Sequence, residues 1–149
     1  MKIKTKYLDE VEIDKEKIIK FEKGLPGFED SKEFALLEIE DLIGFKFLQD
    51  INNEYLCFTL VNPFKFLDSY EFNIPDEKLK RLDLNLNDDL LVYNIVTLAN
   101  SLEESTVNLL APIIINLSNM KGEQFILNND EYKTKHKLFL KGDKDACTK

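Results

Sequence analysis

Apolar and polar residues alternate with a period of two along most of the chain, which is typical of β-strands with one buried face. In residues 2–7, Ile3, Thr5 and Tyr7 alternate with three lysines, which would also protect an exposed sheet edge. The pattern predicts about nine short strands. The runs are residues 2–7, 11–14, 18–21, 34–38, 45–49, 55–61, 90–98, 107–117 and 124–127, with 137–140 as a last short run.

One segment has a helical signature instead. Asn73 precedes Ile74 and Pro75, and two carboxylates follow, so we predict a helix that Asn73 caps and whose first turn contains Pro75. Leu79 and Leu82 would then share one helical face. Many strands and little helix indicate a mostly β domain of antiparallel type, a barrel or a sandwich.

The chain of 149 residues fits one domain and shows no internal repeat or linker. We expect residues 1–140 to fold as that domain. Residues 141–149 have almost nothing to bury and are predicted to be a disordered polar tail. No apolar run has the length of a signal peptide or a membrane span, so we expect a cytoplasmic protein.

The motif GLPGFED, residues 24–30, combines turn residues with large apolar ones. A phosphate-binding loop is not favoured, because Pro26 lacks an N–H group and acidic residues follow where a lysine would be needed. Pro26 instead presets φ, and Gly27 accepts the positive φ of a type II turn. Gly24, Pro26 and Gly27 are therefore predicted to be structural turn residues.

The net charge of −8 comes from the middle of the chain. Residues 31–105 contain 15 acidic and 6 basic side chains, a balance of −9, whereas the two flanking parts are nearly neutral. Because nucleic acids are polyanions, this balance disfavours direct nucleic-acid binding. It suits a basic protein partner, although the same charge also serves solubility alone.

The residues needed for catalysis or metal binding are sparse. The single histidine, His136, lies among lysines and is read as a solvated residue. Cys57 occupies an apolar strand pattern and Cys147 the polar tail, so we predict reduced thiols and no disulfide framework. Asp83, Asn85 and Asn87 imitate the start of a calcium loop. However, Asp88 and Asn94 occupy the places that require glycine and glutamate. We therefore expect no cofactor, no metal site and no enzymatic activity.

Four motifs together resemble one known family. GLPGFED, LVNPF at residues 60–64, TVNLLAPIIIN at residues 106–116 and GEQFIL at residues 122–127 are similar, in this order, to the flagellar assembly factor FliW family. The resemblance extends from about residue 2 to residue 140 and leaves the tail unmatched. The fold that it implies is a small antiparallel β-barrel-like single domain with one or two short helices.

The resemblance also implies a function. FliW proteins are cytoplasmic and non-enzymatic, and they bind both flagellin and CsrA, a basic RNA-binding regulator that represses flagellin translation. Binding to FliW relieves that repression, and accumulated flagellin occupies FliW and releases CsrA. The expected partners are thus CsrA and flagellin, with no direct nucleic-acid contact and no membrane.

Candidate contact residues follow from both lines of reasoning. Phe28, Phe64 and Phe66 are aromatics beside turn residues, either exposed for a partner or folded back over the barrel ends. Pro112 cannot donate to a strand ladder and predicts an edge or a bulge, with Asn108 nearby serving a partner or local backbone groups. In the acidic segment we select Glu38, Glu40 and Asp41 as contacts to the basic regulator.

Three other functions remain open at this stage. The first is a secretion chaperone that binds flagellin only. The second is a lipocalin-like barrel, which needs an internal cavity that the many Phe and Leu side chains argue against. The third is a hydrolase, which needs two carboxylates that converge from distant positions.

Overall fold

Seven strands form a closed β-barrel in the computed structural model, which describes residues 1–40 and 42–138. In ring order the strands are β3 (Ile19–Lys20), β4 (Glu33–Glu38), β5 (Phe45–Asp50), β6 (Cys57–Val61), β7 (Leu90–Thr97), β9 (Ile113–Asn116) and β10 (Lys121–Gln124). All neighbours in the ring are antiparallel except β10 and β3, which pair in parallel. The predicted fold class, including the antiparallel barrel, is confirmed.

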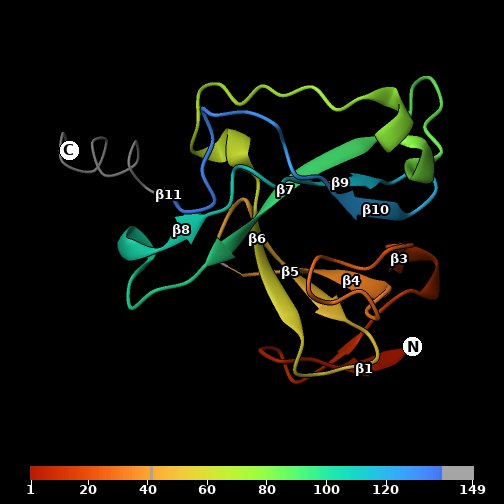
Figure 1. Ribbon diagram of the computed structural model, residues 1–149. Coiled ribbons are helices and arrows are strands. Elements are labelled where there is room, and N and C mark those ends of the chain that lie inside the picture. The colour runs from red at the N-terminus through yellow and green to blue at the C-terminus, as the bar shows by residue number, and fades with distance from the viewer. Residues whose placement is uncertain (41, 139–149) are drawn as a thin grey trace.

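The long strand β7 closes the ring. Its first residues, Leu90 to Tyr93, pair with β9, and Asn94 to Val96 pair with β6. Its end pairs with β8 (Thr106–Val107), which in turn pairs with β11 (His136–Lys137). In Figure 1, β7 therefore crosses the molecule diagonally, with β9 and β10 near one end and β8 near the other.

A separate hairpin precedes the barrel, formed by β1 (Lys2–Lys4) and β2 (Glu10–Glu12). The predicted strand 2–7 ends at Lys4, because the backbone turns at Thr5. The Thr5 N–H donates to the Asp9 carbonyl, and the Thr5 hydroxyl oxygen accepts from the Leu8 N–H. Ile3 is buried and the lysines beside it are exposed, as the alternation predicted.

The inside of the barrel is filled by side chains. The main cluster of buried core residues comprises Ile19, Phe21, Leu25, Phe34, Leu48, Leu60, Tyr93, Ile113 and Ile115. In β10, Gly122 leaves room for the Phe21 ring, whose Cζ atom would lie 2.7 Å from an added Cβ. A side-chain-packed interior of this kind argues against a lipocalin-like ligand barrel.

The predicted helix is wrong in type. Residues 76–82 form two short 3-10 turns, η3 (Asp76–Lys78) and η4 (Lys80–Leu82), and Pro75 precedes the first turn without a side-chain cap from Asn73. Leu82 is the only fully buried residue here, so a single apolar anchor replaces the face that a helix would bury. The other helical elements in the described parts are also 3-10 turns, namely η1 (Lys15–Lys17), η2 (Pro63–Lys65) and η5 (Leu102–Glu104).

The run 107–117 is not one strand but two, β8 and β9, separated by a turn after Asn108. A tight turn precedes β10, because Met120 takes a positive φ of 57° and β10 begins at Lys121. Strand β10 thus begins three residues before the predicted run 124–127 and shares only Gln124 with it. Residues 139–149, which include the predicted tail, lie outside the described residues.

Candidate functional site

The turn at residues 24–28 has the predicted geometry. The Phe28 N–H donates to the Leu25 carbonyl at 2.7 Å, and Gly27 has a φ of +85°. Leu25 is buried in the barrel core, which anchors the turn and holds Pro26 at the surface. Gly24 also has a positive φ, +64°, so both glycines are needed for their backbone conformation.

Asn108 is held by the strand beside it. Its N–H donates to the Ile95 carbonyl at 2.9 Å, and its side-chain oxygen accepts from the Leu110 N–H at 3.1 Å. The buried Asn94 side chain donates to the Asn108 carbonyl at 2.9 Å and to the Tyr70 hydroxyl at 3.1 Å. Asn108 thus satisfies local backbone groups and fixes the start of segment 108–112.

Residues 125–127 continue β10 as an extended segment. The N–H groups of Phe125 and Leu127 donate to the carbonyls of Pro112 and Leu110, at 2.9 and 2.7 Å. Both side chains point inward and are buried, whereas Ile126 between them is 64% exposed. Alternation along the segment therefore places a large apolar side chain on the surface.

A groove of about 280 Å³ lies where these segments meet. It is lined by Pro26, Ile95, Asn108, Leu110, Ala111, Gln124, Ile126 and Thr134. Three motifs far apart in the sequence, GLPGFED, TVNLLAPIIIN and GEQFIL, thus contribute to one surface. We call it the Ile126 groove.

Two of the residues selected from the sequence, Pro26 and Asn108, line the Ile126 groove. Ile126 itself was missed, although the pattern Gln124 to Leu127 contained a signal. Because Phe125 and Leu127 alternate with Ile126, burial of the first two requires exposure of the third.

The selected aromatics lie elsewhere and differ in exposure. Phe28 is 43% exposed and packs edge-to-face on Phe58, with ring centroids 5.3 Å apart. Phe64 is 53% exposed and contacts Tyr70, whereas Phe66 is half-buried against a second buried cluster that includes Phe45, Tyr70 and Val107. Each ring is thus partly folded onto the barrel, and Phe28 and Phe64 also keep an exposed part.

Of the selected acidic residues, Glu38 and Glu40 are exposed, and Asp41 lies outside the described residues. Glu38 pairs with Lys46 on the neighbouring strand β5. For Glu40, no ion pair is found within residues 1–40 and 42–138.

Of the edge and the bulge predicted at Pro112, the open edge is wrong. Pro112 is buried, and strand β9, which follows it, pairs with β7 on one side and β10 on the other. The proline is tolerated because it precedes the ladder and only its carbonyl is used, as acceptor for Phe125.

Two titratable groups considered in the sequence, Cys57 and His136, have shifted pKa values. Burial raises the pKa of the Cys57 thiol to about 11, and nearby Lys6 opposes this effect. The raised pKa disfavours the thiolate, which is the nucleophilic form of cysteine. Burial and nearby Lys133 lower the pKa of His136. The described residues contain no group of three or more potential metal ligands and no helix that is long and apolar enough to span a membrane.

The motif of Asp83, Asn85 and Asn87 forms a turn instead of a calcium loop. The Asp88 carboxylate accepts from the Asn85 N–H at 2.7 Å and from the Asn116 side chain at 2.9 Å. These hydrogen bonds lower the pKa of Asp88. Asp88 thus fastens the turn to strand β9.

Comparison with known proteins gives a consistent result. The sequence profile of the family described as "FliW protein" matches residues 2–138. The chain is 43% identical over 139 residues to the flagellar assembly factor FliW of Geobacillus sp. (strain WCH70), covering 93% of this chain and 96% of the relative. It is 44% identical over 142 residues to the corresponding protein of Clostridium novyi (strain NT), covering 95% and 99%.

A crystal structure of the flagellar assembly factor FliW is also similar. It has a TM-score of 0.87 and 42% sequence identity to this chain, and the match covers 95% of this chain and 99% of that one. The family match over residues 2–138 includes the three segments of the Ile126 groove.

Proposed function

The chain belongs to the FliW family of flagellar assembly factors, and on this premise we propose that it is a non-enzymatic cytoplasmic protein that binds flagellin and the translational regulator CsrA. In this role it couples the supply of flagellin to its translation. Free protein binds CsrA and relieves repression, and accumulated flagellin occupies the protein and releases CsrA.

The observation that carries the proposal is the Ile126 groove. A side chain with 64% of its surface exposed, Ile126, stands among Pro26, Leu110 and Ala111, so the groove has an apolar centre. Polar groups of Asn108, Gln124 and Thr134 lie at the same surface. An apolar centre with polar groups around it is the usual anatomy of a protein-binding site.

Flagellin is the partner that we assign to this groove. Chain ends that polymerise present amphipathic segments, and their capture requires an exposed apolar surface on the binding protein. CsrA is assigned to the acidic middle of the chain, residues 31–105. A protein that binds RNA has a basic surface, and an acidic partner attracts that surface.

The test is calorimetric titration of the protein with the CsrA of its host, repeated with flagellin already bound. We expect CsrA to bind the free protein, and we expect bound flagellin to abolish this binding. Flagellin binding without any CsrA signal would instead support a flagellin chaperone only.

A pair of variants tests the groove. We expect Ile126→Ser to weaken flagellin binding by about tenfold or more, as loss of a central apolar contact does. Leu86→Ser is the matched control, because Leu86 is 93% exposed and does not line the groove. Equal flagellin affinity of the two variants would remove the groove from the proposal.

A further inference from the structure

Strand β4 extends beyond its neighbour β3 in the barrel. Strand β3 pairs only with Glu33 and Phe34, whereas β4 continues to Glu38. Residues 35–38 therefore pair with β5 on one side and with no strand of the described chain on the other. We call this stretch the β4 edge.

The chain leaves the β4 edge because it forms the 3-10 turn η1 just before β3. The Asp14 carboxylate accepts from the Glu16 N–H at 2.9 Å, and the Lys17 N–H donates to the Asp14 carbonyl at 2.9 Å. In a longer β3, Lys17 would lie opposite Leu36, since each step along one antiparallel strand is matched by one step along the other. The turn removes Lys17 from that position.

Backbone hydrogen bonds identify the residues of β4 that face β5. The Ile51 N–H donates to the Glu33 carbonyl at 3.2 Å, and successive residues of a strand direct their backbone groups to opposite neighbours. Glu33 and the odd-numbered residues after it therefore face β5. Leu36 and Glu38 direct their N–H and C=O groups to the other side.

A second hydrogen bond shows that this other side is the side of β3. The Phe21 N–H donates to the Lys32 carbonyl at 2.8 Å, so even-numbered residues along this stretch face β3. Within residues 1–40 and 42–138, no hydrogen bond reaches the N–H or C=O groups of Leu36 or Glu38. An added strand would find two donors and two acceptors there.

A groove of about 280 Å³ lies along the β4 edge. Residues 35–38 line one side of it, and Glu12, Ile13, Asp14 and Lys17 line the other. Because Lys17 lies two residues before β3 in the chain, the groove is on the β3 side of β4. The unpaired backbone groups of the β4 edge thus point toward this groove.

Side chains from both faces of β4 border the groove. Leu36 packs against the barrel core, and Ala35 and Leu37 therefore point to the outer face. Leu36, Leu37 and Ile13 are each partly exposed. A strand added beside β4 would meet apolar side chains with both of its faces.

The charges at the groove are balanced. Three acidic residues and one basic residue line it, but Glu12 pairs with the N-terminal ammonium at 3.1 Å and Glu38 pairs with Lys46. The charges of Asp14 and Lys17 then offset each other. The groove therefore suits an uncharged segment better than a cationic or anionic one.

From these features we propose that the β4 edge binds an uncharged, apolar extended segment of a partner protein by strand addition. The segment pairs with the backbone groups of Leu36 and Glu38, and its alternate side chains contact Leu36 on one face and Leu37 on the other. The inference goes beyond the proposed function and does not depend on which protein occupies the Ile126 groove.

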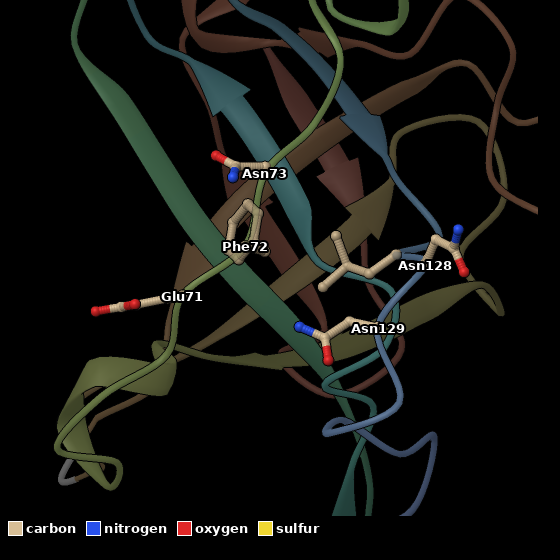
Figure 2. A pocket seen from close by; sticks show the side chains of 6 residues that line it. Glu71, Phe72, Asn73, Asn128 and Asn129 are labelled. Carbon is tan, nitrogen blue, oxygen red and sulfur yellow. The ribbon is translucent and has the colours of Figure 1, made fainter.

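A different groove provides a reference surface. It is lined by residues 71–73 and 127–129, which Figure 2 shows from close by. There the Glu71 N–H donates to the Tyr132 hydroxyl at 2.8 Å, and the Leu127 N–H donates to the Leu110 carbonyl at 2.7 Å. Because these donors are already used, we expect a strand bound at the β4 edge to leave this groove unchanged.

Two labelled hexapeptides test the proposal by fluorescence anisotropy. Both alternate valine with threonine, and the second has N-methyl groups on its central backbone nitrogens, so that neither of its edges can pair. We expect the first to bind at protein concentrations up to about 1 mM and the second to bind about tenfold more weakly or not at all. Peptides with lysine or glutamate in place of threonine should also bind more weakly, and tighter binding of either would contradict the uncharged segment.

Amide hydrogen exchange locates the bound peptide. We expect the unmethylated valine–threonine peptide to protect Leu36 and Glu38 and to leave residues 71–73 and 127–129 unchanged. No binding of this peptide, equal binding of its methylated form, or protection confined to residues outside 35–38 would each overturn the proposal.

Proline variants remove a single donor from an edge. Glu38→Pro deletes an N–H that points away from β5, so the ladder between β4 and β5 stays intact. We expect this variant to weaken peptide binding about fivefold or more. Asn128→Pro is the matched control, because the Asn128 N–H points away from residues 110–112 and belongs to the reference groove. Equal affinities of the two variants would overturn the proposal.

Sedimentation of the protein without peptide distinguishes a second copy of this chain from a partner protein. We expect a monomer at about 100 μM. A dimer that Glu38→Pro abolishes would show that a second copy occupies the β4 edge, and it would overturn the proposal.

Discussion

Among the four glycines in the described part of the chain, Gly24 is the one at which the backbone leaves the least room for a side chain. A Cβ atom there would lie 2.5 Å from the Phe28 carbonyl oxygen and 2.7 Å from that of Glu29, and φ is +64°. Both obstacles are backbone atoms of the same turn, so they cannot move aside without opening it. Gly27 has a similar φ but open space around it, so only its conformation matters.

We therefore predict that Gly24→Ala lowers the free energy of unfolding by at least about 2 kcal/mol, from strain and steric overlap together. Gly27→Ala is the matched control and should cost about 1 kcal/mol, from the positive φ alone. Urea denaturation of the two variants measures the difference. Equal losses would mean that the turn relaxes around residue 24.

His136 leads to a prediction about pH. Because burial and Lys133 lower its pKa in the folded state, the unfolded chain binds the proton more readily. The contribution of neutral His136 is thus fully present above the ordinary pKa of 6.5 and is lost as the pH falls through it toward the folded value.

We expect the free energy of unfolding to fall between about pH 7.5 and about pH 5.5, where carboxylates stay charged. In His136→Gln this part of the decrease should disappear. Urea denaturation at the two pH values checks it, and an identical pH dependence of both proteins would contradict the assignment.

At the scale of elements, one buried side chain joins three segments. Gln49, on β5, is fully buried. Its side-chain oxygen accepts from the Lys6 N–H at 3.0 Å, and its nitrogen lies 3.1 and 3.2 Å from the carbonyls of Asn53 and Leu56. The turn after the first strand and the loop between β5 and β6 thus depend on one amide.

We predict that Gln49→Leu lowers the free energy of unfolding by about 2 kcal/mol, because it leaves buried backbone groups without partners. Amide exchange should accelerate at residues 5–8 and 50–57, whereas residues 113–116 on the opposite part of the ring should keep their relative protection. Uniform acceleration across the barrel would show that Gln49 stabilises only the global fold.

For the whole molecule, the distribution of charge is the functional feature. The net charge of −8 arises from residues 31–105, which include four of the seven barrel strands. This balance gives a basic partner a long-range attraction that salt screens.

We predict that changing Glu38, Glu40 and Asp41 to lysine weakens CsrA binding about tenfold at low salt and flattens its salt dependence. The control changes Glu10, Glu16 and Asp30 to lysine, which alters the net charge equally on exposed residues of the first segment. Calorimetry over a salt series measures both. An unchanged affinity in the first variant would exclude these carboxylates from the contact.

The sequence by itself determined the strands, the turn and the family. The apolar and alternating runs of the sequence marked β4, β5 and β6 closely, and the Pro26–Gly27 pair specified its turn through local φ preferences. The sequence did not distinguish a helix from two 3-10 turns at residues 76–82, because local propensity is similar and only packing of Leu82 separates them.

Only the tertiary structure decided which residues meet. Closure of the ring by β7 and β9, pairing of residues 110–112 with 125–127, and the Ile126 groove beside that pairing all depend on contacts between distant segments. A periodic pattern predicts on which face of a strand a residue lies, but it does not predict which residue of another segment it contacts. For this reason Pro26 and Asn108 were selected from the sequence, whereas their position beside Ile126 came from the fold.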